Sequence, residues 1–211
     1  MSLQTESTKE KLLNIVSSFN TTPFLFIGSG ITRRYCNLPN WDSLLKYFSN
    51  LLNPNNEFAF ARYKHRAHDN YPLLGSIIGD EFDNQWFTDQ SIFELTTASK
   101  ELIQQGVSPF KCAIAEYLQN IMSPNASYEN EETLLKEVLS NNISGIITTN
   151  YDTYIEDMMP DFKTYISQKD LLFSSLQELG EIYKIHGSVS NPNTIVINQD
   201  DYIKFNEQSK Y

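Results

Sequence analysis

The sequence predicts an α/β protein with a Rossmann-like parallel sheet, helices on both faces and an inserted helical subdomain. Short, continuously apolar runs such as F-L-F-I (24–27) are typical of strands buried on both faces. These runs alternate with stretches in which apolar residues recur at helical spacing, as in parallel α/β folds. One long stretch, about 53–127, carries only short helical patches, and we expect it to form an all-helical insertion.

The expected elements follow one another along the chain. Asn40 or Pro39 marks the start of the second helix, and Asn141 and Asn142 mark the end of the helix before the central strand. The expected order is a helix at 8–19, a strand at 24–27, a helix at 41–52, the insertion, a helix at 131–139, a strand at 143–149, a short helix at 154–159, a strand at 162–166, a helix at 170–179, strands at 181–187 and 194–198, and a helix from 200.

Composition limits the classes of function. The chain of 211 residues has a formal net charge of −10, which excludes sequence-independent attraction to nucleic acid or to an anionic membrane surface. No run approaches the length of about 18 apolar residues that a membrane span needs. The two cysteines, Cys36 and Cys112, form no CxxC motif, so we expect neither zinc nor another metal. This usage fits a reducing cytoplasm.

The first candidate site is G-S-G-I-T, directly after the strand at 24–27. Gly28 and Gly30 would allow a tight turn and a close approach of backbone N–H groups to a pyrophosphate, with Ser29 between them. The dinucleotide fingerprint has a third glycine three positions later, where this chain has Arg33. An ordinary strand-to-helix turn is the alternative interpretation, with Arg33 solvated at the surface.

Two further expected strands end in polar residues. I-I-T-T-N-Y-D places Asn150 and Asp152 after the strand at 143–149, and Y-K-I-H-G places His186 at the close of the strand at 181–187. Ligands of parallel sheets bind at the carboxyl ends of strands, so these side chains are candidates for one site. Alternatively, Asn150 caps the helix that follows, Asp152 complements its dipole, and His186 is structural.

Taken in order, G-S-G-I-T, T-T-N-Y-D and I-H-G resemble the NAD-binding core of the Sir2 (sirtuin) family. The sequence is most similar to Sir2-like domains of bacterial anti-phage defence proteins, which share L-P-x-W-x-x-L, here L-P-N-W-D-S-L at 38–44. They also share T-T-N-Y-D and an I-H-G that precedes a strand and a D-Y helix. The resemblance covers nearly the whole chain except the insertion and implies a Sir2-like domain over 1–211.

The resemblance implies that NAD+ is the substrate and that the chain hydrolyses the bond between nicotinamide and ribose. Asn150 would orient the attacking water or the ribose, and His186 would act as general base. Asp152 would accept a hydrogen bond from the nicotinamide carboxamide. The pyrophosphate would lie on the glycine loop formed by Gly28, Ser29 and Gly30, and Thr32 and Arg33 would help to hold it.

Two departures from deacylating sirtuins favour hydrolysis: the chain lacks their four zinc cysteines and their Asp-Phe-Arg. The alternatives are a module that binds NAD or ADP-ribose without cleaving it, a protein deacylase or ADP-ribosyltransferase, and an unrelated scaffold. Because the sequence stops inside an expected element, we expect the N-terminal fragment of a longer protein. A free NAD hydrolase would harm its own cell, so we expect control by homo-oligomerisation or by a regulatory partner or domain.

Overall fold

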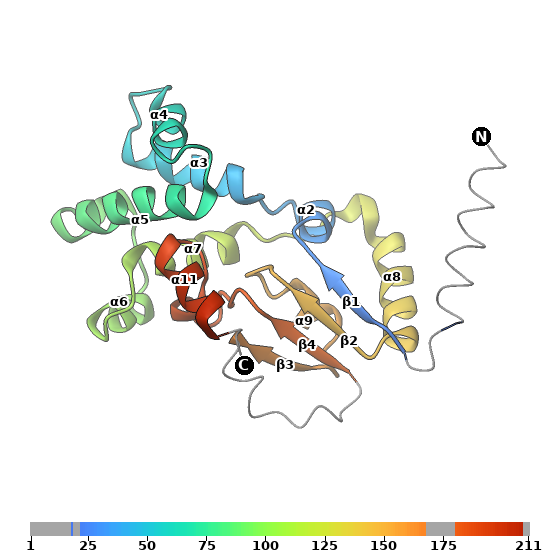
Figure 1. Cartoon of the computed structure of the whole chain (residues 1–211). Coiled ribbons are helices and arrows are strands. Elements are labelled where there is room, and N and C mark those ends of the chain that lie inside the picture. Colours follow the sequence, from blue (N-terminus) through green and yellow to red (C-terminus); the bar gives the residue numbers. More distant parts are fainter. Residues whose placement is uncertain (1–17, 19–21, 168–179, 209–211) are drawn as a thin grey trace.

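The computed structural model describes residue 18 and residues 22–167 and 180–208. The helix expected at 170–179 lies outside the described residues, as does the helix expected at 8–19 except for residue 18. Within the described parts of the chain, helices and a parallel sheet alternate as an α/β protein requires, which confirms the expected fold class (Figure 1).

The sheet of the described residues has four parallel strands in the order β1-β2-β4-β3. Their bounds are β1 Phe24–Ile27, β2 Gly145–Thr148, β3 Lys163–Ile166 and β4 Glu181–Lys184. Ile27 lies opposite Thr148, and Thr148 lies opposite Lys184. The carboxyl ends of β1, β2 and β4 are therefore adjacent and level, so the segments that follow them start at one edge of the sheet.

Strand β1 is not buried on both faces, and that expectation was wrong. Phe24 is 45% exposed and Phe26 is 64% exposed, whereas Ile27 on the opposite face is buried. The physical reason is position, because β1 lies at the edge of the sheet. Phe24 keeps one aromatic contact, stacking on Tyr183 of β4 with ring centroids 5.9 Å apart. Continuous apolar sequence alone did not distinguish an edge strand from a central one.

The helices lie around and beyond the sheet. In Figure 1, α3 to α7 and α11 lie past the arrowheads of the strands, α8 lies beside β1, and α9 lies behind the sheet. The α-helices of the described residues are α2 Gly30–Cys36, α3 Trp41–Leu52, α4 Ala59–Arg66, α5 Tyr71–Thr88, α6 Thr97–Gln104, α7 Pro109–Ile121, α8 Glu129–Asn142, α9 Tyr154–Met158 and α11 Gln199–Gln208. Short 3-10 helices are η1 Gln90–Ile92, η2 Ala126–Tyr128 and η3 Pro192–Thr194.

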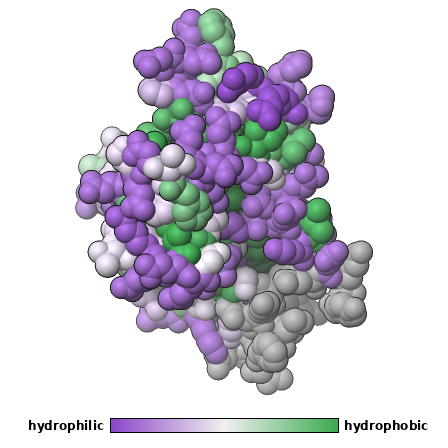
Figure 2. Space-filling view, turned by 90° about the vertical axis from the view of Figure 1, so that its left-hand side faces the viewer, coloured by the Kyte–Doolittle hydropathy of each residue, from purple (hydrophilic) through white to green (hydrophobic). Residues whose placement is uncertain are grey.

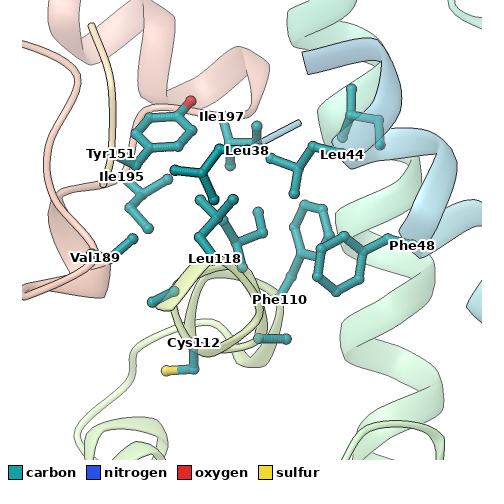
Figure 3. Close-up of a cluster of buried hydrophobic side chains, with 14 of the residues drawn as sticks. Leu38, Leu44, Phe48, Phe110, Cys112, Leu118, Tyr151, Val189, Ile195 and Ile197 are labelled. Atoms are coloured by element: carbon teal, nitrogen blue, oxygen red, sulfur yellow. The ribbon is translucent and has the colours of Figure 1, made fainter. Parts of the chain in front are cut away.

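Helix α3 begins and ends where the sequence predicts. The Asn40 side chain accepts a hydrogen bond from Ser43 N at 2.9 Å, so Asn40 is the N-cap. The regular elements within residues 53–127 are all helices, as expected, and their core continues into the rest of the molecule. Leu44 of α3 and Leu118 of α7 face Ile195, which follows β4, across one hydrophobic cluster (Figure 3).

The segment 194–198 is not a strand, and that expectation was wrong. Thr194 belongs to η3, and the next residues are buried without forming a ladder. The reason lies in the backbone donors. The N–H groups of Ile197 and Asn198 both donate to Oδ2 of Asp201, at 3.1 and 3.2 Å. A carboxylate at the start of α11 thus takes the donors that a sheet ladder would use.

The face formed by the helical side of the molecule is mainly hydrophilic, with hydrophobic side chains in separate small groups (Figure 2). Among the described residues, no helix combines the length and the apolar character that crossing a membrane would require.

Candidate functional site

The structure brings the first two sequence motifs together. Asn150 follows β2, and its side-chain Nδ2 donates to the backbone oxygen of Gly28, at 3.2 Å, in the loop that follows β1. Asn150 is itself buried, and its backbone N–H donates to Oγ1 of Thr148 at 3.1 Å. A residue 122 positions from Gly28 therefore ties the glycine loop to the T-T-N-Y-D segment.

The alternative in which Asn150 caps a helix is wrong. Helix α9 begins after Thr153, whose side chain makes no capping hydrogen bond, and the Asn150 amide is directed to the glycine loop instead. Asp152 does serve the helix, because its Oδ1 accepts a hydrogen bond from Tyr154 N at 3.1 Å. The side chain that bonds to the start of α9 is therefore that of Asp152 and not that of Asn150.

A pocket of about 80 Å³ opens at these strand ends. It is small beside the roughly 300–1,000 Å³ of typical ligand sites. Its polar lining residues include Ser29, Thr32, Asn40, Thr149, Asn150 and Asp152, and its apolar ones include Leu38, Trp41, Leu44 and Leu118. Polar groups from two strand ends thus face apolar groups from the helical part.

Asp152 is buried at this pocket with a positive charge nearby. Burial raises the pKa of its carboxyl, and the charge of Lys184 opposes that rise. Lys184 donates its Nζ to the backbone oxygen of Asp152 and pairs with Oε1 of Glu156 at 2.8 Å. Sequence reasoning missed Lys184, although a lysine within an apolar strand, E-I-Y-K-I, is a signal for a buried charge with a partner.

His186 lies two residues beyond the end of β4, in a turn, and does not line the small pocket. Its ring packs edge-on against Tyr202 and Phe205 of α11, with centroids 5.5 and 5.2 Å away. Burial lowers the pKa of His186, which favours the neutral imidazole. Tyr202 also packs against Trp41, a pocket residue, at 6.1 Å. The imidazole and the pocket are thus separated by one aromatic ring.

Backbone hydrogen bonds join the I-H-G turn to the T-T-N-Y-D segment. Val189 N donates to the oxygen of Tyr151 at 2.8 Å, and the Tyr151 hydroxyl donates to Val196 O at 2.6 Å. Val196 N in turn donates to His186 O at 3.0 Å. These hydrogen bonds therefore hold the backbone of the I-H-G turn against the T-T-N-Y-D segment, while the His186 ring is directed to α11.

The glycines of the two motifs differ in what they do. Gly28 and Gly30 have ordinary backbone angles, and a Cβ added at either would meet nothing within 4 Å. Gly187 has φ of 85°, and a Cβ there would lie 2.2 Å from Thr194 O. Of these three glycines, Gly187 is therefore the one that folding requires. The expected tight turn does not explain Gly28 and Gly30, and their open surface leaves room for a ligand against the backbone.

The remaining predicted residues separate into two kinds. Thr32 is buried at the pocket, and its Oγ1 donates to Ser29 O at 3.4 Å. Arg33 is exposed on α2 and does not line the pocket. Its neighbour Arg34 forms a bidentate pair with Glu131 of α8, at 2.9 and 2.6 Å. Arg34 is therefore engaged in holding α2 to α8.

Fold and site together define an α/β protein with a polar pocket at the carboxyl ends of adjacent parallel strands. Residues 144–211 match the model of the SIR2-like domain, and this match supports a Sir2-like domain in the chain. Asn150, Asp152 and His186 lie within the matched residues, whereas the glycine loop lies before them. A SIR2-like domain indicates NAD-related activity in general. No curated protein matches the chain.

Proposed function

We propose that the chain binds NAD+ at the strand-end pocket and hydrolyses its nicotinamide–ribose bond. Water supplies the oxygen at C1′ of the ribose, nicotinamide leaves as a neutral base, and one proton is released with ADP-ribose. The single observation that carries the proposal is the hydrogen bond from Asn150 to Gly28, with Asp152 buried in the same pocket. It joins the two motifs that the reaction needs.

Each residue at the strand-end pocket would have its own role in binding NAD+ or in the reaction. The open backbone at Gly28, Ser29 and Gly30 would lie against the pyrophosphate, with Thr32 beside it and Arg33 at its solvent side. Asp152 would accept the carboxamide N–H of nicotinamide, held in the small pocket next to Trp41. Asn150 would orient the ribose or the attacking water through its amide. The transition state resembles an oxocarbenium ion, as in other glycosidic cleavages.

The general base is His186 in this proposal. Its neutral form, favoured by the burial that lowers its pKa, can accept a proton from water or a ribose hydroxyl. Its ring is packed on Tyr202 and Phe205 rather than in the pocket. The imidazole would therefore need to turn, or α11 to shift, when the substrate is bound.

That placement favours a second candidate, a module that binds NAD+ or ADP-ribose without cleaving it. Such a module needs the glycine loop, Asn150 and Asp152 but no base beside the ribose. Under either candidate we expect a homo-oligomer or a regulatory partner to control the protein, and a role in antiviral, anti-phage defence in the cytoplasm. These expectations rest on the resemblance in sequence.

The test is to incubate the purified chain with NAD+ and to separate nicotinamide and ADP-ribose by chromatography. Asn150→Ala and His186→Ala should each reduce turnover by several orders of magnitude, with unchanged circular dichroism. Asn193→Ala and His65→Ala, at exposed positions, are the matched controls. Full activity in both site variants contradicts the roles assigned to Asn150 and His186, and the absence of nicotinamide release by the unchanged chain contradicts the hydrolase. Calorimetric binding of NAD+ that is recovered intact supports the binding module instead.

A further inference from the structure

A second pocket lies between helices α2, α8 and α9 and shares no lining residue with the strand-end pocket. Its volume is about 350 Å³, which is within the range of small-ligand sites. Buried Cys36, Tyr154 and Met158 contribute to its lining, together with the half-buried Met122. Thioether and aromatic groups adapt well to flat, polarisable ligands. The pocket is therefore suited to an aromatic ring.

The hydroxyl of Tyr154 is the polar group that this pocket leaves unsatisfied. Tyr154 is only 6% exposed, and within the described part of the chain its hydroxyl makes no hydrogen bond. Its ring is held in place by stacking on Tyr35, with centroids 6.0 Å apart. Buried hydroxyls in folded proteins nearly always have a partner, because an unmade hydrogen bond is costly. Glu132 of α8 lies close enough to raise the pKa of this hydroxyl but makes no hydrogen bond with it within the described residues, so a ligand between the two groups could bond to both.

The charges at the pocket favour a cation. Burial first, and then the neighbouring Glu132 carboxylate, raise the pKa of the Tyr154 hydroxyl. Burial, followed by the negative charges of Asp152, Glu132 and Asp157, raises the pKa of the Cys36 thiol to about 12. Among the lining residues, the opposing charge is Lys136, which is exposed at the rim. The half-buried Glu132 and the exposed Asp157 also line the pocket, so its lining carries two negative charges and one positive charge.

We propose that this second pocket binds a small aromatic ligand that carries a cationic, N–H-donating group. The ring would lie against Met122 and Met158, and the cationic group would donate to both the Tyr154 oxygen and the Glu132 carboxylate. Binding is non-covalent, because the Cys36 thiol stays protonated and is a poor nucleophile. The proposal does not depend on the proposed function, since the two pockets have separate linings.

The pocket nevertheless adjoins the first site through one residue. Tyr154 N donates to Oδ1 of Asp152, so the ligand would contact the residue that fixes the Asp152 carboxylate. Binding of a ligand in the second pocket should therefore also affect the strand-end pocket, through Tyr154 and Asp152.

The probes for the test are benzamidine, benzamide and benzoate, which share a ring and differ in charge. Calorimetric titration of the whole chain, without NAD+, should show benzamidine binding at least about ten-fold more tightly than benzamide, a ratio typical of one added charged hydrogen bond. Benzoate should not bind.

Two variants localise the binding. Tyr154→Phe removes only an unpaired hydroxyl, so it should fold normally and weaken benzamidine binding about ten-fold. Glu132→Gln should abolish the preference for benzamidine over benzamide. Tyr117→Phe, at a stacked tyrosine of α7 away from this pocket, is the matched control. The proposal is overturned if benzamidine does not bind, or if both variants bind it as the unchanged chain does.

Discussion

Lys184 is the residue whose role the structure reveals most clearly. Its side chain is fully buried, pairs with Glu156, and donates to the backbone oxygen of Asp152. A buried ion pair is weak evidence for stability, but loss of one partner leaves the other charge without compensation. Lys184 therefore positions the backbone of Asp152 and also counters the effect of burial on the pKa of that carboxyl.

Lys184→Met should lower the free energy of unfolding by about 3–5 kcal/mol, because it leaves the half-buried Glu156 carboxylate unpaired. Urea denaturation followed by circular dichroism measures this change. Lys204→Met, on the exposed face of α11, should have almost no effect. Adding Glu156→Leu to Lys184→Met should recover part of the loss, since no charge is then left alone. An unchanged midpoint in Lys184→Met would contradict the role assigned to the pair.

His186 should make stability depend on pH. Burial lowers its folded pKa below its usual value of about 6.5, so the unfolded chain binds the proton more tightly. This contribution to stability is fully present above about pH 6.5 and is lost as pH falls from there towards the folded pKa. Thermal melts across this range should show a smaller pH dependence in His186→Gln than in the unchanged chain. His65→Gln, at an exposed position of α4, should behave as the unchanged chain does.

Substitutions at Gly28 and Gly187 should separate an effect on NAD+ binding from an effect on the stability of the fold. Gly28→Ala should leave the free energy of unfolding within about 0.5 kcal/mol, because its Cβ meets open space, and should weaken NAD+ binding. Gly187→Ala should destabilise strongly, since its Cβ would collide with Thr194 O at a positive φ. Chemical denaturation and calorimetric titration measure the two effects. If Gly28→Ala unfolds the chain, the open backbone is structural and not a ligand surface.

At the scale of elements, the start of α11 organises the segment after β4. Asp201 accepts hydrogen bonds from Ile197 N and Asn198 N, and its Oδ1 lies 2.6 Å from the Nζ of Lys111 on α7. Both charged side chains are largely buried. One carboxylate therefore ends the buried segment, starts a helix, and joins that helix to the helical part of the molecule.

Asp201→Asn should cost about 3–5 kcal/mol in the free energy of unfolding, because the Lys111 ammonium loses its charged partner in a buried place. Asp200→Asn, one position earlier and exposed, is the control and should be almost neutral. Urea denaturation of the two variants in parallel checks this. Equal stability of both would show that the buried pair and the two N–H bonds contribute little.

Most elements could be predicted from sequence, because their signals are local. Asn40 marks the start of α3, and Asn142 the end of α8, while the apolar run around Ile146 is a central strand. The misjudged features depend on distant partners. The exposure of Phe26 reflects the place of β1 in the sheet, and Ile197 is not in a strand because Asp201 takes its N–H.

The same distinction applies to the candidate site. Strand ends carrying Asn150, Asp152 and the glycine loop could be predicted to meet, because parallel strands share an edge. The direction in which a side chain points could not be predicted in this way. His186 faces α11 because Tyr202 and Phe205 offer it an aromatic surface, which no spacing within Y-K-I-H-G encodes. The pairing of Lys184 with Glu156 likewise requires the fold.

At the scale of the whole molecule, one hydrophobic cluster extends from the sheet into the helical part. It includes Ile146 and Ile182 of the sheet and Ile78 and Ile114 of the helices. The site therefore lies on a frame in which the two parts share buried surface, and the helical residues 53–127 contribute to its support through Leu118. Separate stability of the two parts is not expected.

Hydrogen exchange under native conditions tests this continuity. The backbone amides of Ile146 and Ile182 should open with the same free energy as those of Ile78 and Ile114, because all four become exposed only when the shared core unfolds. Leu118→Ala should lower all four equally, by roughly 2–5 kcal/mol. A clear difference between the strand and helix amides would show that the helical part unfolds by itself.

The two tryptophans are placed so that only one of them borders the strand-end pocket. Trp41 lines it and packs against Tyr202, whereas Trp86 is buried within the helical part, with its Nε1 donating to Phe93 O at 3.1 Å. A Trp86→Phe variant would therefore carry an intrinsic optical probe at the site, without any attached dye. Its emission would register a nicotinamide ring arriving beside the indole, and also any movement of α11 that brings His186 into position.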